Sequence, residues 1–179
     1  MLPAELMGLN EKNFKKFNYL IKNERFLENL IINVENIIHY VKKNKKNSII
    51  LNYDESSENF FKWYQQLTAE SLGKKSKGIT PIISSMPKDN HSLLQLYLDG
   101  PKNCFFTFFN VTSKTSNKQS NKFILDDKKY LKNKNLSEIL EAQEKSTQNI
   151  FRKKIYLFVH LILKKKMKTL SENYFVFVY

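Results

Sequence analysis

Two polar side chains one helical turn apart, Gln66 and Glu70, are the first residues of this sequence that could take part in chemistry. Residues four positions apart lie on the same face of a helix, and Gly73 follows at a position typical of a helix end. A glutamate holds and returns a proton near neutral pH only where burial raises its pKa from about 4.3. Taken alone, a glutamate on an amphipathic helix is usually a solvated surface residue.

An imidazole at the start of another helical segment, His91, is the second candidate. The positive end of a helix dipole disfavours the imidazolium, so this position predicts a lowered pKa and a largely neutral ring that can exchange protons. Taken alone, a histidine here would more often hydrogen-bond to a neighbour. His39 and His160 match no motif, and neither metal-ligand spacing nor a glycine-rich phosphate loop occurs in the sequence, so we predict no metal and no cofactor.

Helical and strand patterns alternate along the segments that carry these residues. Apolar residues at three- and four-residue spacing predict two helices between residues 11 and 40, with a break near residues 23–25. Ser56 or Ser57 is the predicted cap of the next helix, and Asp89 or Asn90 of the one after. The expected strands are 48–53, 79–84, 104–111 and 155–163, and the expected later helices are 56–72, 89–98 and 136–153.

This alternation predicts the fold class. Strands alternating with helices of ten or more residues pair in parallel through crossover connections, with helices on both sheet faces. We therefore expect an α/β protein, a three-layer α/β/α sandwich with a mainly parallel, doubly wound sheet. A single domain is expected, with leading helices over 1–45 and the sheet region with a divergent tail over 46–179. The residues expected to pack in the core of the helices are Trp63, Tyr64, Leu94, Tyr97 and Leu98.

The composition is that of a soluble globular protein of 179 residues, 41% of them hydrophobic. Its formal net charge of +13 is scattered along the chain, which favours a solvated surface over a polyanion site. The apolar run 155–163 is far short of the roughly 20 residues that span a bilayer. The single cysteine, Cys104, fits a reducing compartment. We expect a cytoplasmic protein with no nucleic-acid partner and no membrane partner.

Three motifs, in this order and spacing, resemble the central region of bacterial glucose-6-phosphate isomerases. They are the helix end WYQQLTAESLGK (63–74), an intervening Gly78 and Pro81, and the helix start DNHSLLQLYLDGP (89–101). The segment LPAELMGLN (2–10) is similar to the stretch that follows the family's arginine-containing glycine motif. The resemblance implies the second sugar-isomerase (SIS) domain of that family and an SIS-like fold.

The resemblance also implies a role for each candidate residue. These enzymes of glycolysis and gluconeogenesis interconvert glucose 6-phosphate and fructose 6-phosphate by moving a proton between neighbouring carbons through an enediolate. Glu70 corresponds to the base, Gln66 to a glutamine that contacts the substrate, and His91 to a histidine that assists ring opening. In the family's homodimer this histidine reaches the neighbouring subunit's site, so Glu70 and His91 of one chain are implied to serve different sites.

The resemblance further implies an incomplete enzyme. The sequence has no counterpart of the first SIS domain that holds the substrate phosphate, of the arginine in a Gly-Gly-Arg motif, or of the lysine in the family's final motif. Without this electrostatic stabilisation the isolated chain is expected to be nearly inactive. The isomerase hypothesis also carries a spatial expectation, that Glu70 and His91 project from the same edge of a parallel sheet.

Two other functions stay open on the sequence. The first is a sugar-phosphate-binding SIS module that keeps the fold without turnover. The second is a nucleic-acid binder that would stack bases on Phe105, Phe106, Phe108 and Phe109. Those four rings lie on both faces of one apolar strand, which favours a buried core over a stacking platform.

Overall fold

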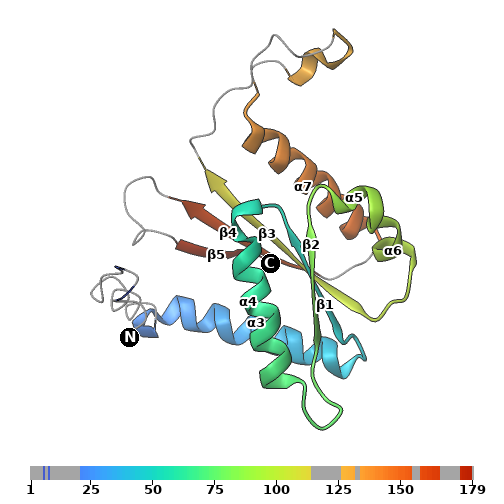
Figure 1. Ribbon diagram of the computed structural model, residues 1–179. Helices are drawn as coiled ribbons and strands as arrows, with labels where there is room; N and C mark the ends of the chain where they lie inside the picture. Colours follow the sequence, from blue (N-terminus) through green and yellow to red (C-terminus); the bar gives the residue numbers. More distant parts are fainter. Residues whose placement is uncertain are drawn as a thin grey trace.

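A five-stranded sheet forms the centre of the molecule (Figure 1). The computed structural model describes residues 6, 8, 21–113, 126–131, 134–154, 158–165 and 174–178. The strand order is β2-β1-β3-β4-β5, with β1 parallel to both β2 and β3, β4 parallel to β3, and β5 antiparallel to β4. The strands are β1 (Asn47–Asn52), β2 (Thr80–Ser85), β3 (Cys104–Ser113), β4 (Phe158–Lys165) and β5 (Tyr174–Val178).

Helices cover both faces of this sheet, which confirms the predicted three-layer α/β/α architecture. Helices α3 and α4 lie on one face, and α5, α6 and α7 lie on the other (Figure 1). The helices are α3 (Glu24–Lys42), α4 (Glu58–Leu72), α5 (Asp89–Ser92), α6 (Leu94–Asp99) and α7 (Leu136–Lys153), with short 3₁₀ helices η2 (Glu55–Ser57) and η4 (Asp126–Leu131).

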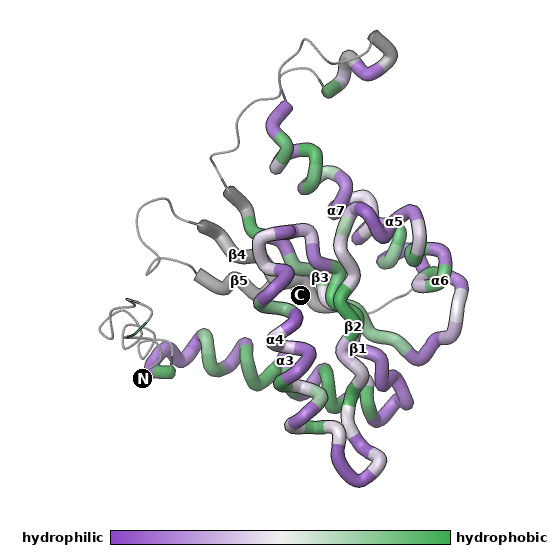
Figure 2. Tube along the Cα trace, viewed as in Figure 1, coloured by the Kyte–Doolittle hydropathy of each residue, from purple (hydrophilic) through white to green (hydrophobic). Residues whose placement is uncertain are grey.

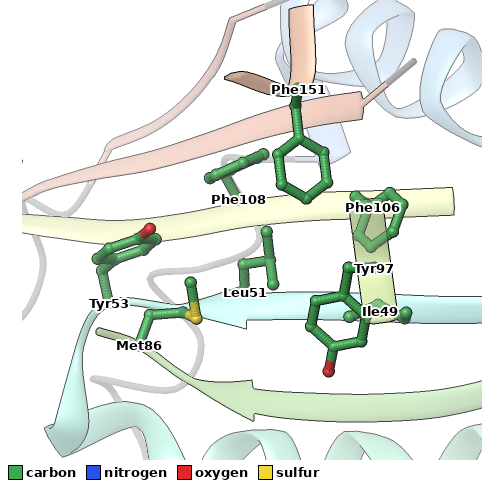
Figure 3. Close-up of a cluster of buried hydrophobic side chains, with 8 residues drawn as sticks. All are labelled: Ile49, Leu51, Tyr53, Met86, Tyr97, Phe106, Phe108 and Phe151. Carbon is green, nitrogen blue, oxygen red and sulfur yellow. The ribbon is translucent and has the colours of Figure 1, made fainter. Parts of the chain in front are cut away.

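The core divides into two clusters because side chains alternate between the faces of each strand. On the α5–α7 face, Phe106 and Phe108 of β3 meet Phe151 of α7 with ring centroids 4.8 and 5.5 Å apart (Figure 3). On the α3–α4 face, Phe109 meets Phe61 of α4 at 4.7 Å, and Phe105 stacks on Tyr40 of α3 at 5.3 Å. The apolar residues gathered along the central strands are visible in Figure 2.

All four phenylalanines of β3 are buried, with no more than 4% of any of them exposed. The alternative in which they stack nucleic-acid bases is therefore wrong, because their faces are covered by the helices. Tyr97 is buried in the first cluster, and Leu94 and Leu98 pack against it; Tyr64 packs against the second cluster. These positions confirm four of the five core residues expected in the helices.

Trp63 is the exception. Its side chain is 57% exposed, although the sequence predicted a core residue. The inward face of α4 carries Phe61, Tyr64 and Thr68, at three- and four-residue spacing, and Trp63 falls outside this stripe. It instead lies beside Phe60 on the outer surface, with ring centroids 5.9 Å apart.

The predicted helix boundaries hold better than the predicted caps. The break near residues 23–25 is confirmed, since Asn23 accepts a hydrogen bond from the Phe26 N–H and α3 begins at Glu24; the helix expected before it lies mostly outside the described residues. Ser57 is the residue before α4, but its hydroxyl donates to the Asp54 carboxylate and caps no helix N–H. A serine at this position thus serves the turn that follows β1 and not the helix.

The helix expected over 89–98 is interrupted. It forms as α5 and α6, separated at Leu93, whose φ of −116° departs from helical geometry. Asp89 does not cap either piece. Its carboxylate turns back to β2 and accepts hydrogen bonds from the Ser85 N–H at 2.8 Å and the Ser84 hydroxyl at 2.9 Å.

The last two strands complete the sheet. Of the run expected as a strand over 155–163, residues 158–163 belong to β4, which lies between β3 and β5 in the strand order, and residues 155–157 lie outside the described residues. In the described part of the chain, no helix combines the length and the apolar character that crossing a bilayer requires.

Truncating Phe151 tests the dependence of the fold on the first cluster. Phe151→Ala removes a ring that is 0% exposed and contacts two rings of β3, so we expect a loss of about 3 to 5 kcal/mol in the free energy of unfolding. The control is Phe60→Ala, which removes a ring that is 51% exposed and should cost less than about 1 kcal/mol. Urea denaturation of both variants measures the difference; equal losses would contradict this account of the core.

Candidate functional site

Gln66 and Glu70 lie together on the outer surface of α4. The Gln66 side-chain amide donates a hydrogen bond to the Glu70 carboxylate over 3.0 Å, as the four-residue spacing predicted. Helix α4 is attached to the sheet by the Gln65 amide, which donates to the Pro81 carbonyl of β2 over 3.0 Å. The pair is therefore carried by a rigid element with a defined position relative to β2.

Both members of this pair are exposed. A glutamate that acts as a base near neutral pH needs a surrounding that removes water from the carboxylate. The described part of the chain does not provide one, so the expectation of a desolvated pocket around Glu70 is wrong for this chain on its own. Any such surrounding has to come from atoms outside the described residues or from another polypeptide.

The connection that follows Glu70 has an unusual backbone. Lys75 and Ser76 have φ values of 54° and 58°, in the left-handed region that non-glycine residues seldom adopt. Gly78 has φ of 121°, and a Cβ atom there would lie 2.7 Å from the Leu72 carbonyl oxygen, so only glycine fits. Backbone of this kind is held in place by its surroundings and is found preferentially at functional sites.

His91 lies in α5, beyond the end of β2 and on the other face of the sheet. Its side chain is exposed. It lies in the last turn of a helix of only four residues. The expectation of a neutral ring rested on the dipole of a longer helix, and this position lacks such a dipole. Asp89 fixes the turn that presents His91, through its bonds to β2 and a longer one, 3.4 Å, from the Ser92 hydroxyl.

The expectation that Glu70 and His91 share one edge of the sheet is wrong. Helix α4 starts beyond the carboxyl end of β1 and returns to the amino end of β2, so its last turn and Glu70 lie at the amino edge. His91 follows the carboxyl end of β2 directly and lies at the opposite edge. A parallel crossover imposes this separation, and it agrees with the implication that the two residues serve different sites.

A buried polar cluster between β3 and α7 was not anticipated from the sequence. The Glu144 carboxylate, 3% exposed, accepts hydrogen bonds from the Asn110 amide at 2.6 Å and from the Gln148 amide at 3.0 Å. The signal in the sequence was the spacing within α7, which places Glu144 and Gln148 on the same inward face of the helix as Phe151. A polar residue on the core face of a helix points to an internal network.

Tyr53 is buried next to this cluster, with Thr147, Glu144 and Asn90 around its hydroxyl. Burial raises the pKa of Tyr53 to about 12, and the Glu144 carboxylate acts in the same direction. The phenol is therefore a neutral group throughout the physiological range. Among the described residues, no three His, Cys, Asp or Glu side chains gather as they would around a metal ion.

Several curated proteins are similar in sequence to this chain. A glucose-6-phosphate isomerase of Methanocaldococcus jannaschii is 37% identical over 136 residues, which cover 75% of this chain and 33% of that protein. One of Campylobacter jejuni is 44% identical over 78 residues, covering 41% and 19%. One of Mycoplasmopsis pulmonis is 31% identical over 153 residues, covering 82% and 36%. The chain thus spans little more than a third, at most, of these relatives.

A solved structure supports the fold assignment. A hypothetical protein of Thermus thermophilus superposes with a TM-score of 0.63 at 22% sequence identity, over 71% of this chain and 32% of that one. At this identity the likeness concerns the fold alone. No family model matches the chain.

The raised pKa of Tyr53 predicts a loss of stability in alkali. Between pH 10 and 12 the folded chain keeps the phenolic proton that the unfolded chain releases, so the free energy of unfolding is retained below about pH 10 and falls as the pH rises through this range. A shift of two units corresponds to about 2 to 3 kcal/mol. Urea denaturation at increasing pH should show the free energy of unfolding of wild type falling by about this amount relative to that of Tyr53→Phe, which has no phenolic proton at this position. A difference that does not change with pH would contradict the prediction.

Proposed function

Since the chain is a relative of the glucose-6-phosphate isomerases, we propose that it is part of such an enzyme, which interconverts glucose 6-phosphate and fructose 6-phosphate. The observation that carries the proposal is the Gln66–Glu70 pair on one face of α4, within the segment that resembles the family's catalytic helix end. The proposed unit is a single, incomplete second SIS domain over residues 1–179. The lone Cys104 supports a reducing, cytoplasmic setting for the enzyme.

In the proposed reaction Glu70 is the base. Its carboxylate takes the proton from one carbon of the open-chain sugar phosphate and returns it to the neighbouring carbon, from one face of the enediolate. Gln66 already orients one carboxylate oxygen through its amide, which leaves the other oxygen to meet the substrate. The exposure of the pair means that desolvation of the base depends on the rest of the enzyme.

His91 acts in a second copy of the site under this proposal. It exchanges protons with the ring oxygen and hydroxyl of the cyclic sugar and so opens the ring. Its location at the opposite edge and on the opposite face from Glu70 supports a homodimer, because a single chain then supplies a base to one site and an imidazole to another. Two chains related by a twofold axis would complete both sites.

Apolar side chains on the outer surface of α3 and α4 support a larger assembly. At least 37% of each of these side chains is exposed, and those of α3 recur at four-, three- and four-residue spacing, which makes one continuous stripe. The relatives contain about twice as much additional chain as the part matched here, and we propose that this additional part covers the stripe. The side chains are Leu27, Ile31, Val34 and Ile38 of α3, and Phe60, Trp63 and Leu67 of α4.

Trp63 allows a direct test of this covering, since it is the only tryptophan of the chain. The rest of the Methanocaldococcus jannaschii isomerase, expressed as a separate polypeptide, would be mixed with this chain to give a reassembled enzyme. With fluorotryptophan in this chain only, the fluorine signal of Trp63 should be accessible to a soluble paramagnetic quencher in the free chain and several-fold less accessible after reassembly. A Trp63 signal equally accessible in both states would argue against a covered surface.

The catalytic role of Glu70 is tested in the same reassembled enzyme. Glu70→Gln keeps the shape of the side chain and removes the base, so we expect kcat to fall by about 10²- to 10⁴-fold. The matched control is Glu58→Gln, which alters another exposed carboxylate of α4, one that pairs with Lys62 at 2.7 Å. A coupled isomerase assay should find the control within about twofold of wild type, because exposed ion pairs contribute little.

The alternative from another class is a sugar-phosphate-binding SIS module without turnover. The exposed position of Glu70 favours it for the chain in isolation. The probe is 6-phosphogluconate, which resembles the open-chain sugar phosphate. If the reassembled enzyme binds it but does not isomerise sugar phosphates, the binding module is the better description. If Glu70→Gln leaves measurable turnover unchanged, the proposed base is wrong.

A further inference from the structure

Two buried polar atoms at the carboxyl edge of the sheet have complementary chemistry and make no hydrogen bond of regular geometry. They are the hydroxyl of Tyr53, a residue only 2% exposed, and the side-chain carbonyl oxygen Oδ1 of Asn90. A hydroxyl donates one hydrogen, and an amide carbonyl accepts. Buried polar groups in native proteins are almost always paired, so each of these atoms requires an explanation.

The surroundings of Tyr53 leave Asn90 as the acceptor that lacks a donor. The hydroxyl lies within side-chain hydrogen-bonding range of Thr147 and, less closely coupled, of Asn90, with the Glu144 carboxylate near. The Glu144 oxygens already accept from the Asn110 and Gln148 amides. The Thr147 hydroxyl, which donates to the Gln143 carbonyl over 3.0 Å, is the other possible acceptor, but it is not left unpaired if Tyr53 bonds elsewhere.

We propose that the Tyr53 hydroxyl donates a hydrogen bond to Asn90 and that Tyr53 is thereby a positioning residue for His91, the residue that follows Asn90 in α5. The proposal deepens the proposed function, because it rests on His91 having a role in the enzyme's site. The two side chains already adjoin.

Helix α5 needs an attachment of this kind. A helix of four residues has almost no stability of its own, since the first turn costs more than its hydrogen bonds return. Asp89 attaches the first residue of α5 to β2 through Ser84 and Ser85. A bond from Tyr53 to Asn90 would add a second attachment, directly before His91.

Tyr53 is itself held firmly enough to act in this way. Its ring is stacked on Phe108 with centroids 6.4 Å apart and an interplanar angle of 13°, and its N–H donates to the Phe109 carbonyl over 2.8 Å. Figure 3 shows the ring in the core, next to Met86. The backbone of His91 would thus be tied to the rigid centre of the sheet, and the direction of its imidazole would follow.

Nuclear magnetic resonance of the complete chain tests the bond itself. Tyr53→Phe removes only the hydroxyl and keeps the stacked ring, so we expect the Asn90 side-chain amide resonances to move and the amides of α5 to exchange with solvent about fivefold faster or more. The midpoint of the His91 titration should shift in the same variant. The control is Tyr40→Phe, which alters a buried tyrosine on the opposite face and should leave all three readouts unchanged.

A double-mutant cycle provides the second measurement. If the two side chains bond, Tyr53→Phe combined with Asn90→Ala should accelerate α5 exchange by much less than the product of the single effects. Strictly multiplicative effects, or an unchanged Asn90 amide and His91 titration in Tyr53→Phe, would overturn the proposal.

These readouts need no turnover, so they test the Tyr53–Asn90 bond separately from the proposed isomerase function. In the reassembled enzyme, a positioning role predicts that Tyr53→Phe lowers kcat and shifts its pH profile, and that Tyr40→Phe does neither. If the bond is found but the reassembled enzyme is inactive with every sugar phosphate, the proposed function fails and the attachment of α5 stands. If turnover is normal and Tyr53→Phe behaves as Tyr40→Phe does, the inference about Tyr53 fails and the proposed function stands.

Discussion

The burial of β3 on both of its faces is the interaction on which the rest of this structure depends. Phe106 and Phe108 project into one helical layer, and Phe105 and Phe109 project into the other, so a single strand supplies aromatic surface to both halves of the core. Burying an aromatic side chain contributes a few kcal/mol. Because β1 pairs in parallel with both β2 and β3, successive strands have to connect by crossovers, and the helices of the crossovers from β1 to β2 and from β2 to β3 carry the candidate residues.

The parallel topology also determines how chemistry can be distributed over the chain. A helix that links two parallel strands starts at the carboxyl edge and finishes at the amino edge, so residues at the end of α4 and at the start of α5 cannot meet. The separation of Glu70 from His91 follows from this geometry and from nothing local to either residue. Under the proposed function, such a chain contributes to shared sites only in combination with other copies or other segments, which fits the partial coverage of its relatives.

The exposed surface of the chain is consistent with that view. The candidate carboxylate accepts a hydrogen bond from the Gln66 amide and is exposed, and the apolar stripe of α3 together with the outer aromatic residues of α4 faces outward. Under the proposed function the two features have the same cause, because a water-poor pocket around the base and a packed interface over the stripe both require atoms that the described residues do not contain.

Local pattern was sufficient for most of the elements, because helix and strand periodicity and glycine stops are properties of neighbouring residues. The limits of α7 and the breaks at Asn23 and Gly73 were therefore predictable, as was the contact of Gln66 with Glu70. Tertiary packing decided the rest. Trp63 faces outward because the inward stripe of α4 was set by its contact with the sheet, and Asp89 binds β2 because that strand end is within reach. The network of Glu144 and the opposite edges of the two candidate residues arise from segments far apart in the sequence, which no local pattern can bring together.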